Sequence, residues 1–192
     1  MRVDLSDLYL LGEAFERGAA RADFTCSTDD VGKWVSGERT QTIALKQCEG
    51  RRLCDLMVTT HTLDLISNRI QSALLEESIT GWATCPVVLK DRKGELIPDY
   101  AALATTGRCG PLVNSRSKKV TKENYAGTGF MDVYLGYYFD EDSWDGSDMF
   151  RPEGTRMTIV TRHVRDIIMA IKATNIEFEP ILEVERLEAA LI

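Results

Sequence analysis

The sequence predicts an α+β fold, and three observations support this prediction. The first is an internal repeat: residues 66–70 align without a gap with residues 160–164, and Pro86 aligns with Pro180, 94 residues later. The second is that each copy reads as an apolar strand, an amphipathic helix and a second apolar strand. The third is that β-branched and aromatic runs lie outside the copies. We therefore expect two related strand–helix–strand units, produced by duplication, with additional antiparallel strands.

Both copies carry local signals for the ends of a helix. Ser67 and Thr161 occupy corresponding positions, and each can cap a helix start. The apolar residues that follow recur three or four positions apart, which predicts one buried helix face. Gly81 and Asn175 tolerate a left-handed backbone, so they predict where each helix gives way to its second strand.

The N-terminal part of the chain has weaker patterns. Residues 5–15 are rich in leucine and lead into a Gly-Ala stretch, which predicts a short strand or turn followed by a helix. Residues 27–50 are mostly polar, but they contain two apolar runs. We expect these runs, Val31–Val35 and residues 40–45, to form strands because they are rich in β-branched side chains.

Four further elements are expected between and after the copies. Tyr100–Thr105 reads as a strand. Residues 106–129 scatter Arg and Lys among Gly, Ser, Asn and Thr, which predicts an exposed, mobile excursion. Residues 131–139 are aromatic and β-branched enough to form a strand. In residues 183–192 the apolar side chains have helical spacing, so we expect a helix that packs back on the body.

Length and composition indicate a globular protein that binds no nucleic acid. The 192 residues are enough for one domain over 1–192, or for two lobes, residues 1–98 with the first copy and 99–192 with the second. With 44% apolar and 28% charged residues the chain can bury a core. The net charge of -7 argues against a broad basic face for nucleic acid and suits a basic partner protein.

The sequence also predicts a cytoplasmic protein with free thiols. No apolar run approaches the roughly 18 residues of a membrane span, and the first residues lack the basic-then-apolar order of a secretion signal. The five cysteines form no CxxC pair, so a structural zinc site has poor spacing. We expect free, mostly buried thiols at Cys26, Cys48, Cys54, Cys85 and Cys109.

The acidic turn at residues 140–148 does not fit a calcium loop. Counted from Asp140, the fifth position is Trp144, and the sixth, where a glycine must turn sharply, is Asp145. The twelfth position is Arg151, where a bidentate glutamate is needed. No metal site is therefore expected.

Two other interpretations of this turn are compatible with each other. In the structural one, aromatic side chains anchor the turn in the core, a left-handed position reverses the chain and an aspartate caps backbone amides. Its residues are Trp144, Asp145, Gly146, Asp148 and Phe150. In the functional one, exposed carboxylates meet a basic partner. Those residues are Asp140, Glu141 and Asp142, with Asp132 as a further candidate.

No pattern for catalysis is found. The chain has no Gly-x-Ser-x-Gly elbow, and His61 and His163 each lie among ordinary strand and helix residues. The Gly127-Thr128-Gly129 stretch is too short for a phosphate loop. Basic residues 116–122 lack interleaved aromatic side chains and read as a solvated loop. We expect neither an enzyme nor a cofactor.

Several motifs in the C-terminal half resemble a known family. They are Trp144-Asp145-Gly146-Ser147-Asp148-Met149-Phe150, Gly154-Thr155, Ile159-Val160-Thr161, Val164 and the stretch from Thr174 to Pro180. Together they look like the C-terminal signature of the eleventh family of immunity proteins from bacterial polymorphic toxin systems, formerly a domain of unknown function with myxobacterial members. The chain is also similar to the myxobacterial double-CxxCG proteins. It lacks their CxxCG motifs, and with them the metal site that they imply.

The resemblance implies a small cytoplasmic protein that binds a cognate toxin domain, neutralises it and protects the producing cell during bacterial competition. It supplies no catalytic residues, and it does not fix the toxin's activity. The alternative from the residues is a small-ligand-binding or enzymatic module that uses the cleft between the two copies. A third interpretation is an oligomeric interaction protein, and the sequence leaves the oligomeric state open.

Overall fold

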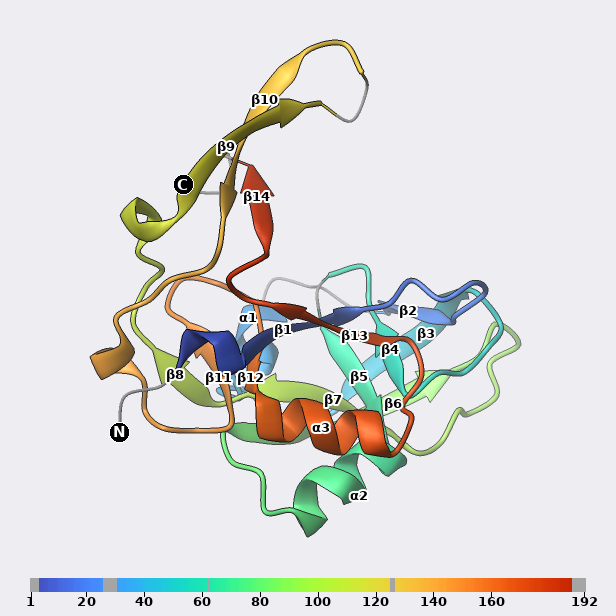
Figure 1. Ribbon diagram of the computed structural model, residues 1–192. Helices are drawn as coiled ribbons and strands as arrows, with labels where there is room; N and C mark the ends of the chain where they lie inside the picture. The colour runs from blue at the N-terminus through green and yellow to red at the C-terminus, as the bar shows by residue number, and fades with distance from the viewer. Residues whose placement is uncertain (1–3, 26–30, 62, 125–126, 188–192) are drawn as a thin grey trace.

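The computed structural model describes residues 4–25, 31–61, 63–124 and 127–187, and within these ranges the predicted α+β fold is confirmed (Figure 1). Strands predominate, and most of them pair antiparallel. In chain order the elements are η1 (Leu5–Asp7), β1 (Leu8–Glu13), β2 (Arg21–Phe24), α1 (Val31–Val35), β3 (Ile43–Glu49), β4 (Leu56–Val58), β5 (Asp64–Ser67), α2 (Asn68–Glu76), β6 (Trp82–Lys90), β7 (Tyr100–Thr105), β8 (Gly107–Cys109), η2 (Asn114–Arg116), β9 (Lys118–Glu123), β10 (Phe130–Leu135), η3 (Glu141–Ser143), β11 (Met149–Pro152), β12 (Ile159–Thr161), α3 (Arg162–Ala170), β13 (Ile176–Pro180) and β14 (Glu185–Leu187).

A six-stranded sheet forms one half of the body, in the order β2-β3-β6-β7-β5-β4. Its pairs are antiparallel except for β3 and β6. A bridge between Ala22 and Thr59 joins the β2 edge to the chain just after β4, so the sheet curls almost into a barrel. The interior is filled by side chains from the strands and from α1: Ala22, Trp34, Val35, Ile43, Leu45, Met57, Leu65, Cys85, Leu89 and Ala102.

A five-stranded sheet, in the order β13-β1-β12-β11-β8, forms the other half. The helices α2 and α3 lie side by side against the body (Figure 1). Each helix buries one apolar face, as its spacing predicts, with Ile70 and Leu74 on α2 and Val164 and Ile168 on α3. These side chains share one core with residues of both large sheets, which unites the two halves.

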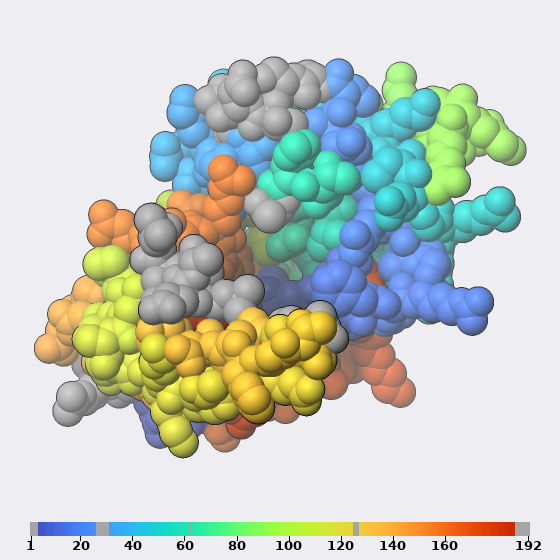
Figure 2. Space-filling model, turned by 90° about the horizontal axis from the view of Figure 1, so that it is seen from above, coloured from blue at the N-terminus to red at the C-terminus, as the bar shows by residue number. Residues whose placement is uncertain are grey.

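The third sheet, β14-β10-β9, projects from the body (Figure 1). Seen from above, the β9–β10 hairpin (yellow) lies on one side of the molecule, and the light blue region of α1 and β3 lies on the other (Figure 2). Phe130, at the start of β10, is 79% exposed. We refer to β9, β10 and β14 as the arm.

The two strand–helix–strand units expected from the repeat, β5-α2-β6 and β12-α3-β13, have similar local structures. The helices begin after Ser67 and Thr161, and the positive φ angles at Gly81 (81°) and Asn175 (59°) mark the entries to β6 and β13. In each copy an antiparallel strand from elsewhere lies between the two strands of the unit. It is β7 between β5 and β6, and β1 between β12 and β13.

Some predicted elements differ in the structure. Val31–Val35 is the helix α1, not a strand, because Val31, Trp34 and Val35 lie three and four positions apart and bury one helix face. Residues 8–13 form β1, and the chain then turns at Arg17-Gly18 instead of entering a helix. The strand prediction for Tyr100–Thr105 is confirmed by β7.

The region after β7 is more regular than predicted. Residues 106–129 contain β8, η2 and β9, and β9 pairs along its full length with β10. The expected exposure is confirmed for β9, whose residues are exposed or partly buried, but the segment includes regular strands. The strand expected over 131–139 begins at Phe130 and ends at Leu135. The expected C-terminal helix is wrong at Glu185–Leu187, which pairs with β10 as β14, and residues 188–192 lie outside the described ranges.

No helix in the described part of the chain is long and apolar enough to cross a membrane.

The strand β1, from the first half of the sequence, pairs with β12 and β13 from the second.

Candidate functional site

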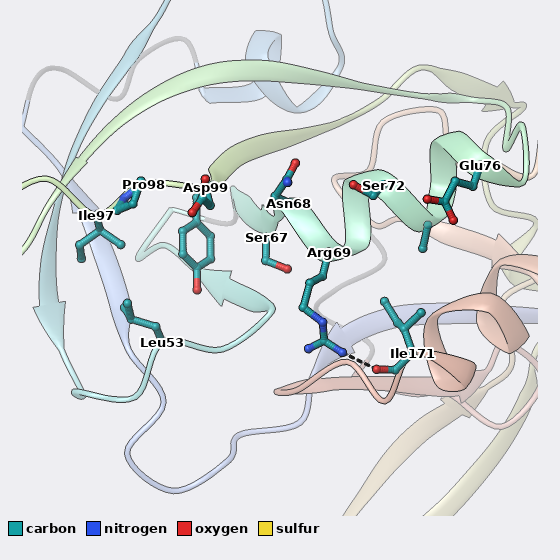
Figure 3. A pocket seen from close by; sticks show the side chains of 12 residues that line it. Leu53, Ser67, Asn68, Arg69, Ser72, Glu76, Ile97, Pro98, Asp99 and Ile171 are labelled. Atoms are coloured by element: carbon teal, nitrogen blue, oxygen red, sulfur yellow. Dashed lines mark hydrogen bonds between the residues drawn. The ribbon is translucent and has the colours of Figure 1, made fainter.

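A groove of about 880 Å³ runs along α2, and we call it the α2 groove (Figure 3). Four stretches of chain that are distant in sequence meet there: the loop before β4, the helix α2, the loop that enters β7, and the end of α3. The lining residues are Leu53, Ser67, Asn68, Arg69, Ser72, Ala73, Glu76, Ile97, Pro98, Asp99, Tyr100 and Ile171.

Backbone contacts fix the end of the groove near the start of α2. Ser67 pairs with Tyr100 in the β5–β7 ladder. The Asn68 N–H donates to the carbonyl of Asp99 (2.8 Å), and Asp99 adopts a positive φ of 67° that turns the chain into β7. The helix start and the loop before β7 are thus held against each other.

Arg69 spans the space between the two copies. Its guanidinium donates to the Asp55 carboxylate (2.8 Å) and to the carbonyl of Ile171 at the end of α3 (2.5 Å), a bond drawn in Figure 3. Burial alone would raise the pKa of Asp55, but hydrogen bonds from Ser67 and Thr174, together with the charge of Arg69, lower it. The Asp55 carboxylate is therefore ionised, and it forms its hydrogen bonds and its ion pair within the fold.

The open side of the groove is apolar and acidic. Leu53 is 50% exposed, and Ile97 and Pro98 lie beside it (Figure 3). Glu76 and Asp99 add two exposed carboxylates, and neither has an ion-pair partner among the described residues. A surface of this kind can hold an apolar side chain that has a cationic group next to it.

The four predicted partner-binding carboxylates do not gather at this groove. Glu141 accepts from Arg116 at 2.8 and 3.1 Å, and its side chain is only 15% exposed. Asp132 lies on the arm, where it pairs with Lys119 (2.8 Å). Asp140 caps η3 by accepting the N–H of Asp142 (3.2 Å), and both residues are exposed. Of the four predicted carboxylates, Asp140 and Asp142 are therefore the two exposed ones without an ion-pair partner among the described residues.

The aromatic part of the turn lies against the core. Phe150 is fully buried, and its ring centroid lies 5.5 Å from that of Trp144. Trp144 is partly buried and donates its ring N–H to the carbonyl of Ser147 (3.2 Å).

The remaining predicted turn residues hold backbone groups. Gly146 has a φ of 85°, and the Asp145 carboxylate accepts the N–H groups of Arg108 (2.7 Å) and Ser147 (3.0 Å). Asp148 accepts the N–H of Thr80 (3.0 Å) and so ties the turn to the end of the first copy. The carboxylates of Asp145 and Asp148 are therefore used in hydrogen bonds within the fold.

The histidines lie in different places. His163 lines a shallow hollow of about 350 Å³ between α2 and α3, together with Asp166, Glu76 and Glu77. The His61 ring packs edge-on against Phe24, 5.8 Å between centroids. The hollow beside His163 corresponds to the cleft between the copies that the sequence suggested as a ligand site.

Four of the cysteines lie in the described ranges, and all four are free thiols, while Cys26 lies outside them. Cys48 is exposed and Cys54, Cys85 and Cys109 are buried. Burial raises the pKa of Cys109 to about 12, so this thiol is protonated at neutral pH and is a poor nucleophile.

Comparisons with known proteins add no relative. No family model matches the sequence. No curated protein matches it either.

Proposed function

We propose that this chain is a cytoplasmic immunity protein that binds a cognate toxin domain and neutralises it by covering the toxin's active site or a surface near it. The observation that carries the proposal is the α2 groove, where apolar side chains lie at the Asp99 end and Glu76 lies at the other end, both carboxylates having no ion-pair partner among the described residues (Figure 3). Exposed apolar surface with a polar rim is typical of a protein–protein contact. The resemblance of residues 144–180 to immunity proteins supplies the class of partner.

The groove's chemistry defines the segment of toxin that it would hold. An apolar side chain from the toxin packs against Leu53 and Ile97, and a flanking Lys or Arg meets Glu76 or Asp99. The net charge of -7 draws a basic partner from a distance, and this attraction weakens as salt rises. Asp140 and Asp142 form a second acidic contact at the turn.

The proposal is tested by purifying the tagged protein from a lysate that contains the products of neighbouring genes, followed by co-expression with each product that binds. An immunity protein suppresses the toxicity of one such product. A set of neighbours in which none binds and none is toxic contradicts the proposal.

A pair of charge insertions then tests the groove. Leu53→Glu places a carboxylate in the apolar lining and should weaken toxin binding at least tenfold. Val88→Glu is the matched control, because Val88 is also exposed (41%) but does not line the groove. Equal binding by the two variants would locate the contact elsewhere while leaving the immunity function intact.

The hollow beside His163 favours a second candidate function, a small-ligand or enzymatic site between the copies. An imidazole that lines the same hollow as the carboxylates of Asp166 and Glu77 is a combination that can move protons. NMR signals of the His163 ring, followed during a metabolite screen, test this candidate. It fails if no compound shifts these signals or if His163→Ala binds the same compounds.

We also propose that the two units arose by duplication. The matching helix starts at Ser67 and Thr161, neither of which caps its helix through its side chain, the matching positive φ angles and the inserted antiparallel strand in each unit support this origin. In the cleft between the units, α2 and α3 then occupy equivalent positions.

A further inference from the structure

Two arginines lie directly opposite each other at one edge of the five-stranded sheet. The strands β8 and β11 form a parallel pair, and its register places Arg151 beside Arg108. Residues that are paired in register project from the same face of a sheet, and like charges in this position repel. The fold therefore holds two positive charges together on one face.

Arg108 is held mainly by carbonyl groups. Its guanidinium donates to the carbonyl oxygens of Thr105 (2.5 Å), Gly107 (2.8 Å) and Ser36 (2.8 Å). The nearby Asp145 carboxylate accepts the Arg108 backbone N–H (2.7 Å). The negative charge of Asp145 offsets part of the positive charge of the Arg108 guanidinium. The side chain is thus fixed in place, and it keeps N–H donors that these three bonds do not use.

Arg151 has no such partners. Its guanidinium forms no hydrogen bond or ion pair with any residue in the described ranges, although the residue is partly buried. Burial lowers the pKa of Arg151, the charges of Arg108 and Arg156 lower it further, and Glu38 opposes them. The positive neighbours outweigh the negative one, so Arg151 lies in a local excess of positive charge.

A hollow of about 310 Å³ opens beside these side chains, lined by Arg108, Cys109, Arg151, Glu153 and Gly154. The Cys109 thiol is neutral and supplies no charge. Glu153 is exposed and adds one carboxylate to the lining, against the two guanidinium groups of Arg108 and Arg151. Gly154 has a φ of 76°, and a Cβ there would meet nothing within 4 Å, so the mouth beside it is open.

We propose that this hollow binds a phosphate group, either as the free ion or as a phosphate ester, between the guanidinium groups of Arg151 and Arg108. The planar fork of Arg151 can donate two parallel N–H···O bonds to one phosphate, while Arg108 supplies a second, pre-positioned cation. The double negative charge of phosphate offsets the two positive charges of the arginines more fully than the single negative charge of a carboxylate does. The site shares no residue with the α2 groove, so it is independent of the immunity function.

The test compares thermal unfolding in sodium phosphate and in sodium chloride of equal ionic strength. Phosphate should raise the Tm of the full chain by about 3 °C or more beyond chloride at saturating concentration. Arg151→Gln should unfold at a higher temperature than the unaltered protein in chloride, because the like-charge contact is relieved, and it should show no additional rise in phosphate. The matched control Arg17→Gln, at an exposed arginine, should keep the full rise.

A phosphate effect no larger than that of chloride, or one that persists in Arg151→Gln, overturns the proposal. If Arg151→Gln does not fold, Arg151→Lys keeps the charge but loses the fork, and phosphate should bind at least fivefold more weakly by calorimetry. Unchanged affinity in Arg151→Lys also counts against the site. Titration with inorganic phosphate and with phenyl phosphate identifies the source: tighter binding of the ester indicates a phosphorylated ligand, and tighter binding of the ion indicates free phosphate.

Discussion

Asp55 and Thr174 hold each other through three hydrogen bonds across the boundary between the two copies. The Asp55 carboxylate accepts the backbone N–H (2.9 Å) and the hydroxyl (3.0 Å) of Thr174, and the Asp55 N–H donates to the Thr174 hydroxyl (2.9 Å). Thr80 and Asp148 make the same three contacts in the opposite direction, at 3.0, 2.7 and 3.0 Å. In each contact the threonine comes from within one unit, and the aspartate directly precedes β4 or β11, the strand that leads toward the other unit.

Replacing Asp55 by Ala should destabilise the protein strongly. The N–H of Thr174, the hydroxyl of Ser67 and the guanidinium of Arg69 all lose the buried Asp55 carboxylate as their acceptor. We expect a loss of about 2–4 kcal/mol in the free energy of unfolding, measured by urea titration. The control Asp142→Ala removes an exposed carboxylate and should change it by less than about 0.5 kcal/mol. Similar values for both variants would show that Asp55 is not a structural contact.

Ser67 and Thr161 occupy equivalent positions but should respond differently to removal of the hydroxyl. The Ser67 hydroxyl donates to Asp55 (2.7 Å), whereas the buried Thr161 hydroxyl has no hydrogen-bond partner among the described residues. Ser67→Ala should cost about 1 kcal/mol, and Thr161→Val should be neutral or stabilising. Urea titration of both variants checks the difference, and an equal cost at the two positions would contradict it.

Asp64 should make the protein less stable as the pH rises. Asp64 is partly buried at the start of β5, and this burial, with a smaller effect of Glu13, raises its pKa to about 7 from the usual 3.8. Between these two values the folded chain keeps a proton that the unfolded chain has released, so stability falls as pH increases. Asp64→Asn should therefore raise the Tm at pH 8 and change it little near pH 4. Parallel Tm curves for the two proteins from pH 4 to 8 would refute the assignment.

Asp140 and Asp142 should affect how fast a basic toxin associates. Asp140→Asn with Asp142→Asn should slow association two- to tenfold at low salt and leave the dissociation rate nearly unchanged, because exposed charges act on the encounter. Stopped-flow fluorescence with the identified toxin measures both rates. Glu141→Gln is the control, since Glu141 already pairs with Arg116. Association that is equally fast in all three proteins at low salt would remove the turn from the interface.

The repeated units can be predicted from the sequence because their signals are local. Ser67 and Thr161 lie at the helix starts, and Gly81 and Asn175 adopt the backbone angles that their residue types favour. For α1 the composition is misleading: two valines in a short run suggest a strand, but Val31, Trp34 and Val35 have the spacing of one helix face. The spacing is the better guide there.

The α2 groove could not be predicted in the same way. Leu53, Glu76 and Asp99 come from three separate segments, and they meet only because the β5–β7 register sets Ser67 beside Tyr100. Register between distant strands depends on the packing of the whole sheet. The pairing of Arg108 with Arg151 has the same origin, since nothing near either residue in the sequence indicates the other.

The place of β1 between β12 and β13 has a consequence for synthesis on the ribosome. The strands β4 to β7 and the helix α2 are contiguous in sequence, so the first unit can assemble as soon as Thr105 has left the exit tunnel. Leu8 instead pairs with Thr161, and Tyr9 pairs with Pro180. The apolar strand β1 must therefore wait, unpaired, until residues 159–180 have emerged. Slow translation of the C-terminal third would prolong that exposure and increase the demand for chaperones.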